Sequence, residues 1–338
     1  MTKRKTSLAL FVVLLIAGGC SRETRSSNHA SSSPPPRTRT KVELRQEWFP
    51  YSGFTGEAVA ARRFATAEGL DLKVVPGSES VDPIKLVISG ASDFAVASSD
   101  LVIDAVAKGA PLVAIGVVNE RTPTCFLVRQ SSSIQGPADF VGHKVGVLPG
   151  TNTERVYALM MKRSGIDRAK VREVAIPFDL NTFLLGEYDV RPAFIYDEPV
   201  SLELKSVPYR IIRPQEHGVS SFIGTVYFTR RDILEKNPDI ARHLVKALAA
   251  GWTFTLAHPE ESIDDLVKAF PTLDKRRELR SLQLGSSYFA GAGGKPLRAT
   301  TADWQGTITA LEEVGAIPPG RVHVSDVWTD VFVESAYR

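Results

Sequence analysis

From Lys41 onward, apolar and polar residues follow one another in a pattern that predicts a regular succession of strands. Short runs rich in β-branched and aromatic residues, bounded by Gly, Pro, Asn or Asp, are typical of strands. Ten such runs occur, at residues 41–48, 70–77, 93–99, 110–119, 124–130, 143–150, 171–177, 192–199, 209–214 and 224–230.

The segments between these runs predict helices. Stretches with helical spacing of apolar residues lie at 57–68, 81–89, 153–164 and 181–186. Strands that alternate with helices favour an α/β fold with mostly parallel sheets. The last third differs, because Asp239–Ala257 places Ile240, Leu244, Leu248 and Trp252 on one helical face. Further helices are expected at 260–269, 274–286, 302–314 and 324–336, so the C-terminal region is predicted to be helical.

The first residues have the layout of a signal peptide. Lys3, Arg4 and Lys5 precede the apolar run Leu8–Ala17, and small residues follow. A run of ten apolar residues is too short for a bilayer-spanning helix, which takes about 20. We therefore expect residues 1–19 to be a signal peptide rather than a resident transmembrane helix.

Cys20 ends the segment "IAGGC", which resembles the lipobox of bacterial lipoproteins, although Ala17 stands where that pattern has Leu. The resemblance implies lipidation of Cys20, with ordinary signal cleavage as the alternative. Residues 21–40 are rich in Ser, Pro and Arg and predict a disordered tether. A lipid-anchored protein on the periplasmic side of the cell envelope is the expected arrangement, with the membrane contacted through the anchor only.

The charge argues against nucleic acid as a partner. The formal net charge is +3, and loss of residues 1–19 removes three cations and no acids, which leaves 38 basic and 38 acidic residues. Phosphate binding needs a concentrated positive face, which a neutral body does not suggest. Cys125, the cysteine left after Cys20, is expected to be a small buried hydrophobe.

Four segments with polar or aromatic residues follow predicted strands, where open α/β sheets bind ligands. They are 47–57 ("EWFPYSGFTGE"), 89–100 ("SGASDFAVASSD"), 145–154 ("VGVLPGTNTE") and 193–203 ("AFIYDEPVSLE"). Taken alone, each segment can also be explained without a ligand, because its residues could cap a helix, place a charge at a helix start or pack an aromatic ring in the core. In the first segment we expect Pro50 and Gly53 to end the strand and Phe49, by strand period, to point into the core.

The motifs "EWFP", "VISGASDFAVASSD", "DFVGHKVGVLPGTNTE", "YDEPVSLELKSVPYRIIRP" and "GTVYFTRRDILEKNPDIARHLVKALAAGW" together resemble those of the NMT1/THI5-like substrate-binding proteins of ABC importers, the group that includes binding proteins for thiamine-pyrimidine precursors and riboflavin. The resemblance implies the type II periplasmic-binding-protein fold, with two α/β lobes around a cleft that closes by a hinge. It places lobe one at 41–127 plus 226–338 and lobe two at 128–225.

By position, the resemblance also implies a ligand site for a small aromatic heterocycle. Its residues would be Trp48, Tyr51, Phe54, Ser98, Ser99, Asn119, Thr151, Asn152, Thr153, Tyr196, Asp197 and Glu198. Several relatives have a histidine in the first loop, where this chain has "PYSGFTG", so the thiamine precursor itself is less strongly indicated. The partners implied are the solute and an ABC permease; a monomer without cofactor or metal is expected.

Three other functions remain open at this point. A binding protein for a small oxyanion, such as a sulfonate or nitrate, would need a convergent arginine, and Arg121 and Arg155 are the candidates. An enzyme is not favoured, because no nucleophile–base pairing or metal-ligand spacing stands out. A sensory binding module would share the receptor's cleft.

Overall fold

The computed structural model describes residues 39–338. The predicted signal peptide, Cys20 and nearly all of the predicted tether lie outside the described residues, and Thr40, at the end of that tether, is the first residue of strand β1.

Sheet A contains five strands in the order β2-β1-β3-β10-β4. Their bounds are β1 Thr40–Arg45, β2 Leu70–Val75, β3 Phe94–Ser98, β4 Leu112–Val117 and β10 Thr225–Arg230. β1 pairs in parallel with β2 and β3, whereas β10 is antiparallel to both β3 and β4. Three of these strands, β3, β4 and β10, are buried along almost their whole length, which accounts for their continuous apolar runs.

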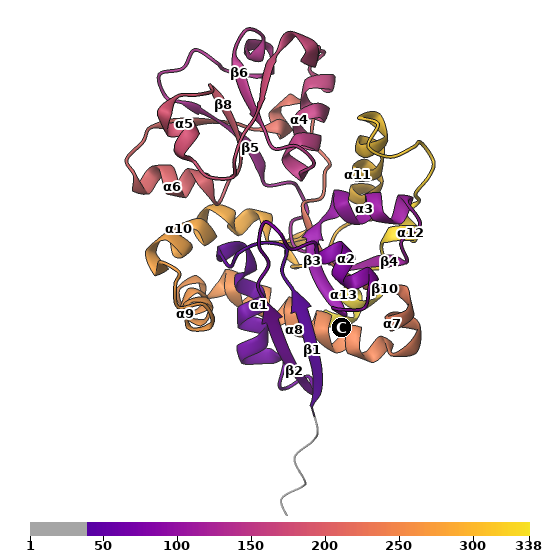
Figure 1. Ribbon diagram of the computed structural model, residues 1–338. Helices are drawn as coiled ribbons and strands as arrows, with labels where there is room; N and C mark the ends of the chain where they lie inside the picture. The colour runs from indigo at the N-terminus through magenta and orange to yellow at the C-terminus, as the bar shows by residue number, and fades with distance from the viewer. Residues whose placement is uncertain (1–38) are drawn as a thin grey trace, which may run out of the picture. The chain divides into compact units, whose positions relative to one another are not determined.

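Sheet B repeats this plan with five strands in the order β7-β6-β8-β5-β9. Their bounds are β5 Thr124–Arg129, β6 Lys144–Val147, β7 Arg172–Ala175, β8 Val190–Phe194 and β9 Tyr209–Ile212. β6 is parallel to β7 and β8, and β5 is antiparallel to β8 and β9. The two sheets form separate groups in Figure 1, with β5, β6 and β8 apart from β1–β4 and β10.

The chain passes between the sheets twice, through residues 118–123 after β4 and through residues 213–224 before β10. All ten predicted runs overlap a strand, and the predicted two-lobe α/β fold is confirmed. The sheets are mixed, because in each of them one strand runs against the other four. The lobe boundaries at residues 127/128 and 225/226 remain our proposal.

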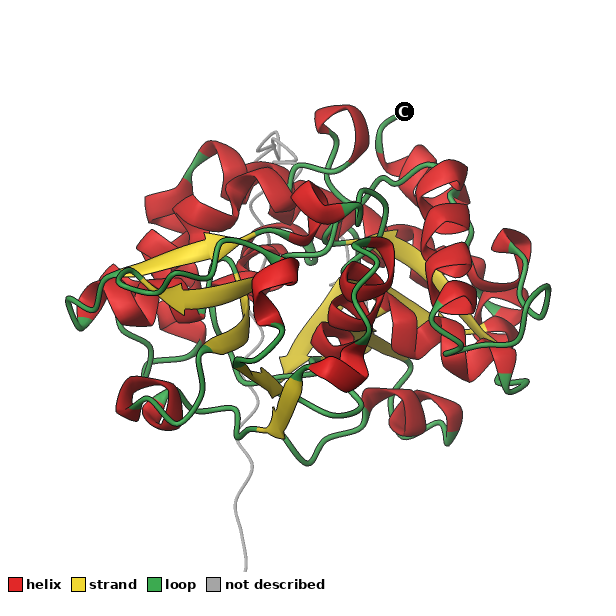
Figure 2. Ribbon diagram, turned by 90° about the horizontal axis from the view of Figure 1, so that it is seen from above, coloured by secondary structure: helices red, strands yellow, loops and turns green. Residues whose placement is uncertain are grey.

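Helices surround the strands of both sheets (Figure 2). The α-helices are α1 Thr55–Val59, α2 Pro83–Ile88, α3 Ser99–Ala107, α4 Asn152–Arg163, α5 Asn181–Leu185, α6 Glu198–Leu204, α7 Arg231–Lys236, α8 Pro238–Ala257, α9 Pro259–Ala269, α10 Lys275–Gly285, α11 Thr301–Glu313, α12 Val324–Val327 and α13 Val331–Ala336. α1 continues into a π-helical turn, η2 (Ala60–Phe64), and short 3-10 turns follow Tyr51 (η1, Ser52–Phe54) and α10 (η6, Ser286–Tyr288). Within residues 39–338, no helix combines the length and apolar character that crossing a membrane requires.

The contact between α1 and α8 depends on glycine. A Cβ atom on Gly251 would lie 2.3 Å from the carbonyl oxygen of Gly56, and one on Gly56 would lie 2.2 Å from the Trp252 ring. The two backbones therefore approach more closely than any side chain allows. Trp252 is buried, stacks on Phe289 with centroids 4.6 Å apart and donates a hydrogen bond to the Tyr227 hydroxyl.

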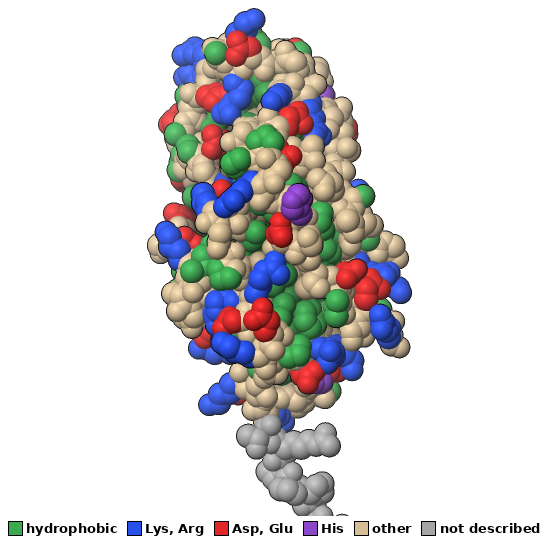
Figure 3. Space-filling model, turned by 90° about the vertical axis from the view of Figure 1, so that its right-hand side faces the viewer, with side chains coloured by type: hydrophobic (Ala, Val, Ile, Leu, Met, Phe, Trp, Pro, Cys, Tyr) green, Lys and Arg blue, Asp and Glu red, His purple; other side chains and the backbone are tan. Residues whose placement is uncertain are grey.

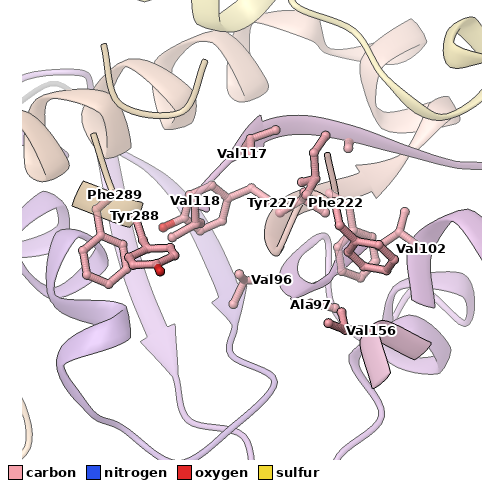
Figure 4. Packing of buried hydrophobic residues seen from close by; sticks show 14 of the residues in the cluster. Val96, Ala97, Val102, Val117, Val118, Val156, Phe222, Tyr227, Tyr288 and Phe289 are labelled. Carbon is pink, nitrogen blue, oxygen red and sulfur yellow. The ribbon is translucent and has the colours of Figure 1, made fainter. Parts of the chain in front are cut away.

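The hydrophobic core is continuous from sheet A to helix α4 beside sheet B. In Figure 4, Phe222 of the return segment lies with Val102 of α3 and Val156 of α4, while Tyr227 and Phe289 lie further along the same core. Cys125 is buried, as predicted. On the face shown in Figure 3, basic and acidic side chains are interspersed.

Candidate functional site

A cavity of about 530 Å³ lies at the carboxyl ends of strands from both sheets. Sheet A contributes the loops after β1, β2 and β3, and sheet B contributes the loops after β6, β7 and β8. This is the position at which open α/β sheets hold ligands. The lining comprises Glu47, Trp48, Tyr51, Ser78, Glu79, Val81, Pro83, Ser98, Leu101, Leu148, Gly150, Thr151, Asn152, Thr153, Phe178, Asp179, Leu180, Asn181, Pro192, Ala193, Phe194, Asp197, Glu198, Ser201 and Lys205.

The loop after β1 brings aromatic rings to this cavity. Trp48 packs against Phe178, from the loop after β7, with ring centroids 4.8 Å apart. The Tyr51 ring lies over Gly53, where a Cβ atom would come within 2.4 Å of the ring. Gly53 thus gives Tyr51 the space to turn toward the cavity, and Tyr51 stacks on Tyr196 at 6.0 Å.

Eight of the twelve predicted site residues line the cavity: Trp48, Tyr51, Ser98, Thr151, Asn152, Thr153, Asp197 and Glu198. Their role as ligand-binding residues remains a prediction. The other four, Phe54, Ser99, Asn119 and Tyr196, are buried outside the lining.

Internal contacts account for these four positions. Phe54 packs edge-on against Tyr51 in the core. The Ser99 hydroxyl donates to the carbonyl oxygen of Ile223 at 2.6 Å. The Asn119 amide lies between the Tyr196 hydroxyl and the Tyr288 carbonyl oxygen, at 3.4 Å from each.

The prediction for Phe49 was wrong. Its side chain is 50% exposed, and its ring meets Trp48 edge-on at 5.5 Å. β1 ends at Arg45, so the two-residue alternation of a strand no longer applies at Phe49.

The start of α4 is hydrogen-bonded to α3, to β5 and within its own turn. The Asn152 amide nitrogen donates to Asp100 at 3.0 Å, and its oxygen accepts from the Thr124 hydroxyl at 3.1 Å. Thr151 donates to the carbonyl oxygen of Leu148 at 2.7 Å and lies 2.9 Å from the Thr153 hydroxyl. Asn152 therefore links α3 to α4. Within this turn the Thr153 hydroxyl has one hydrogen-bond partner, Thr151, whereas the Thr151 hydroxyl has two.

Glu47 is the most prominent lining residue that the sequence analysis missed. It receives a hydrogen bond from the Ser98 backbone N–H at 2.9 Å. Burial, with a smaller effect of the nearby Asp100, raises the pKa of the Glu47 carboxyl to about 7. Its place directly before the aromatic run, just beyond a strand end, was the available signal.

Glu198, at the first turn of α6, is a second carboxyl of this kind. It accepts from the Phe194 N–H at 2.8 Å, and Arg191 lies 3.8 Å away. Burial, reinforced by the charge of Asp197, raises the pKa of Glu198 to about 7. Asp197 itself pairs with Arg277 of α10.

The cavity is acidic. Five carboxyl residues line it, Glu47, Glu79, Asp179, Asp197 and Glu198, against one cationic residue, Lys205. Arg121 and Arg155, the arginines proposed for an oxyanion, are not among the lining residues. Arg155 instead pairs with buried Asp100 at 2.6 Å, across the gap from α4 to α3.

The family model described as NMT1/THI5 like matches residues 53–262, which is more than half of the chain. The chain belongs to the NMT1/THI5-like family.

Three characterised relatives of this NMT1/THI5-like protein have names of two kinds. The formylaminopyrimidine-binding protein of Halalkalibacterium halodurans is 26% identical over 77% of this chain and 77% of its own length. The riboflavin-binding protein RibY of Chloroflexus aurantiacus is 24% identical over 80% of this chain and 79% of its own. A 4-amino-5-hydroxymethyl-2-methylpyrimidine phosphate synthase of Legionella pneumophila is 26% identical over 70% and 75%.

Solved structures agree on the fold of this NMT1/THI5-like protein. The periplasmic aliphatic sulphonate binding protein SsuA of Escherichia coli has a TM-score of 0.67 at 18% identity and covers 86% of this chain and 92% of its own. The nitrate-binding protein NrtA of Synechocystis PCC 6803 has a TM-score of 0.69 at 13% identity and covers 88% of each chain. At these identities the likeness concerns the periplasmic-binding-protein fold.

The lining of the cavity in this NMT1/THI5-like protein combines carboxyl groups with aromatic rings. No histidine is among its lining residues. Over residues 39–338, no group of three or more His, Cys, Asp and Glu side chains is placed to hold a metal ion. What the cavity offers is aromatic faces and hydrogen-bond acceptors.

Proposed function

We propose that this protein is the extracytoplasmic solute-binding component of an ABC importer and that it captures a small aromatic nitrogen heterocycle. The observation that carries the proposal is the cavity itself, where Trp48, Tyr51 and Phe178 lie beside Glu47 and Glu198 at strand ends of both sheets.

The chemistry of the lining supports a flat polar ring. Aromatic side chains provide stacking surfaces, and the carboxyl groups accept hydrogen bonds from ring N–H or amino groups. Because the pKa values of Glu47 and Glu198 lie near 7, a bound N–H donor or cation would favour their ionised forms. A volume of about 530 Å³ falls within the range of small-molecule sites.

The same lining disfavours the oxyanion alternative. An anion would face five carboxyl residues, of which Asp197 is paired with Arg277 outside the lining, and the lining itself has one lysine and no arginine. Charge repulsion of this kind costs affinity and supports selection against anions. The sulfonate and nitrate names of the structural neighbours therefore do not guide the choice of solute.

We also propose that the protein is a receptor and does no chemistry on its solute. The relatives include both binding proteins and a synthase, so the names alone do not decide. The aromatic faces that lie beside hydrogen-bonding carboxyl groups support binding. We further propose that Cys20 is lipidated, that the protein is a monomer and that it delivers the solute to a membrane permease.

Closure of the two lobes over the solute is part of this proposed function. Contacts that would hold the closed form already flank the cavity: Asp100 with Asn152 and Arg155 on one side, and Asp197 with Arg277 on the other. The first contact joins α3, next to sheet A, to α4, next to sheet B. The second joins α10 to the loop that follows β8 of sheet B.

Native mass spectrometry tests the proposal. Protein isolated without refolding is sprayed intact, and any retained small molecule is released and identified by fragmentation. We expect one heterocycle molecule to be retained per chain. If that ligand is first removed, adding an aminopyrimidine or a flavin should restore the complex. Retention of a sulfonate or nitrate instead, or turnover of the pyrimidine to a new product, would contradict the proposal.

A further inference from the structure

A second pocket, of about 270 Å³, lies away from the heterocycle cavity, and the two share no lining residue. Its walls come from the first crossing segment, β9, the start of the return segment, the loop into α6, and the end of α10 with η6. The lining comprises Arg121, Ile195, Pro199, Tyr209, Ile211, Arg213, Leu284, Ser287 and Tyr288.

The charge of this pocket is opposite to that of the heterocycle cavity. Arg121 and Arg213 line it, and no Asp or Glu does. Within residues 39–338, neither arginine has a carboxylate oxygen within 4.0 Å, whereas most other arginines of the fold do. The neighbouring acid Glu203 is engaged elsewhere, with Arg280 and the Tyr209 hydroxyl. Two guanidinium groups are thus left without a counter-ion around one hollow.

Both arginines line the pocket together with Tyr288. The Arg121 guanidinium lies over the Tyr288 ring, 4.7 Å from its centroid, and donates to the Ser287 hydroxyl at 3.1 Å. Burial raises the pKa of the Tyr288 phenol, and the positive charges of Arg121 and Arg213 both oppose that rise. Both guanidinium groups and the Tyr288 ring therefore belong to the lining of one pocket.

Apart from Ser287, the rest of the lining is aliphatic or aromatic. Ile195, Ile211 and Leu284 provide aliphatic wall, and Tyr209 and Tyr288 provide ring surface. Such a mixture suits a flat apolar body that carries a negative group, because the rings and aliphatic groups cover the body while the guanidinium groups bind the anion.

We propose that this pocket is a binding site for a small aromatic carboxylate, held by Arg121 and Arg213 through charge-assisted hydrogen bonds. Guanidinium groups match the two oxygens of a carboxylate, and the hydroxyl of Ser287 is placed to add a donor. The site is independent of the proposed heterocycle binding, because its residues, its charge and its location differ.

The test uses 4-fluorobenzoate as the probe and 4-fluorobenzamide, its neutral near-isostere, as the matched ligand. Fluorine NMR follows line broadening and shift during titration with the full mature chain. We expect the carboxylate to bind at least tenfold more tightly than the amide, because hydrogen bonds from guanidinium groups to a charged carboxylate are stronger than those to a neutral amide. Equal binding of the amide, or no binding of 4-fluorobenzoate up to millimolar concentration, would overturn the proposal.

Variants assign the site. The double substitution Arg121→Gln with Arg213→Gln is expected to weaken 4-fluorobenzoate binding at least tenfold, while Arg121→Lys with Arg213→Lys retains part of it. Both arginines are exposed, so the fold should survive, and circular dichroism checks this. Arg276→Gln, at an exposed arginine of α10 outside the pocket, is the control. Unchanged binding in the double glutamine variant, or loss in Trp48→Ala, would place the anion elsewhere and refute the assignment.

Discussion

Glu57 shows how strongly single buried carboxyl groups are perturbed in this protein. Its side chain is fully buried, one oxygen accepts from the Gln46 amide at 2.7 Å, and the other has no partner among the described residues. Burial raises the pKa of Glu57 to about 8, so at neutral pH the carboxyl is mostly protonated in the folded protein. Glu57 lies beneath the aromatic loop but does not line the cavity.

The substitution Glu57→Gln therefore changes stability in a pH-dependent way. The native pKa, about 8, exceeds the ordinary value of 4.5, so the folded state binds the proton more tightly. This contribution is complete below pH 4.5 and is lost as the pH rises to 8. Relative to the parent protein, Glu57→Gln should gain stability on the order of 3 kcal/mol between pH 5 and pH 8. Urea unfolding at both pH values measures it, and an equal difference at the two pH values would contradict it.

Trp48 is the ring on which binding of a flat solute should depend most. Trp48→Ala removes the face that packs against Phe178, and stacking with its apolar burial is worth about 1.5–3 kcal/mol. We expect the affinity for the heterocycle to fall roughly 10- to 100-fold by isothermal titration calorimetry. Phe49→Leu, at the exposed neighbouring position, should change it less than threefold. Equal losses in the two variants would show that the loop, and not the Trp48 ring, matters.

At the residue scale, the sequence identified the loops that line the cavity more reliably than the individual side chains that line it. Trp48, Tyr51, Asp197 and Glu198 line the cavity because the segments that follow strands converge there. Ser99 and Asn119 also follow strands, but hydrogen bonds to Ile223 and Tyr288 use them inside the fold. Those partners are more than 100 residues away in the chain, so no local pattern reveals them.

At the scale of elements, the junction of α1 and α8 supports the base of the aromatic loop. Gly251→Ala would place a methyl carbon 2.3 Å from the Gly56 carbonyl oxygen, so the helices must separate. Overpacking of this kind costs about 1–3 kcal/mol. Thermal unfolding should show a lower midpoint for Gly251→Ala, whereas Ala250→Ser, at a partly exposed position of α8, should remain near the parent value. A parental midpoint for Gly251→Ala would mean that the helices can shift freely.

The contact of α3 with α4 should control closure. Asp100 is fully buried and pairs with Arg155 at 2.6 Å, so Arg155→Gln leaves that carboxylate short of a charged partner in the closed form. We expect roughly tenfold weaker solute binding, mainly from faster dissociation, by stopped-flow fluorescence. Arg168→Gln breaks the 2.7 Å pair with Glu173, which lies within the sheet B half, and serves as control. If the two variants release the solute at the same rate, the Asp100–Arg155 pair does not control closure.

At the scale of the whole molecule, the fold followed from the sequence more completely than the site did. Buried strands such as β3 and β4 read as continuous apolar runs, and α8 shows a clear helical period, so their existence was predictable. The antiparallel placement of β5 and β10 was not evident from periodicity, because pairing depends on distant partners. The predicted helix at 324–336 divides into α12 and α13 where Trp328 bridges to Ala114 and stacks on Trp304.

We propose that the acidic, aromatic cavity selects a small nitrogen heterocycle over an oxyanion. Isothermal titration calorimetry of the ligand-free protein tests this selectivity, with 4-amino-5-hydroxymethyl-2-methylpyrimidine, riboflavin, an alkanesulfonate and nitrate compared at pH 7.5. We predict saturable binding of one heterocycle per chain at micromolar affinity or tighter, lost in Trp48→Ala, and no heat of binding with the two oxyanions. Tight binding of the sulfonate or nitrate, with none of either heterocycle, would contradict the account.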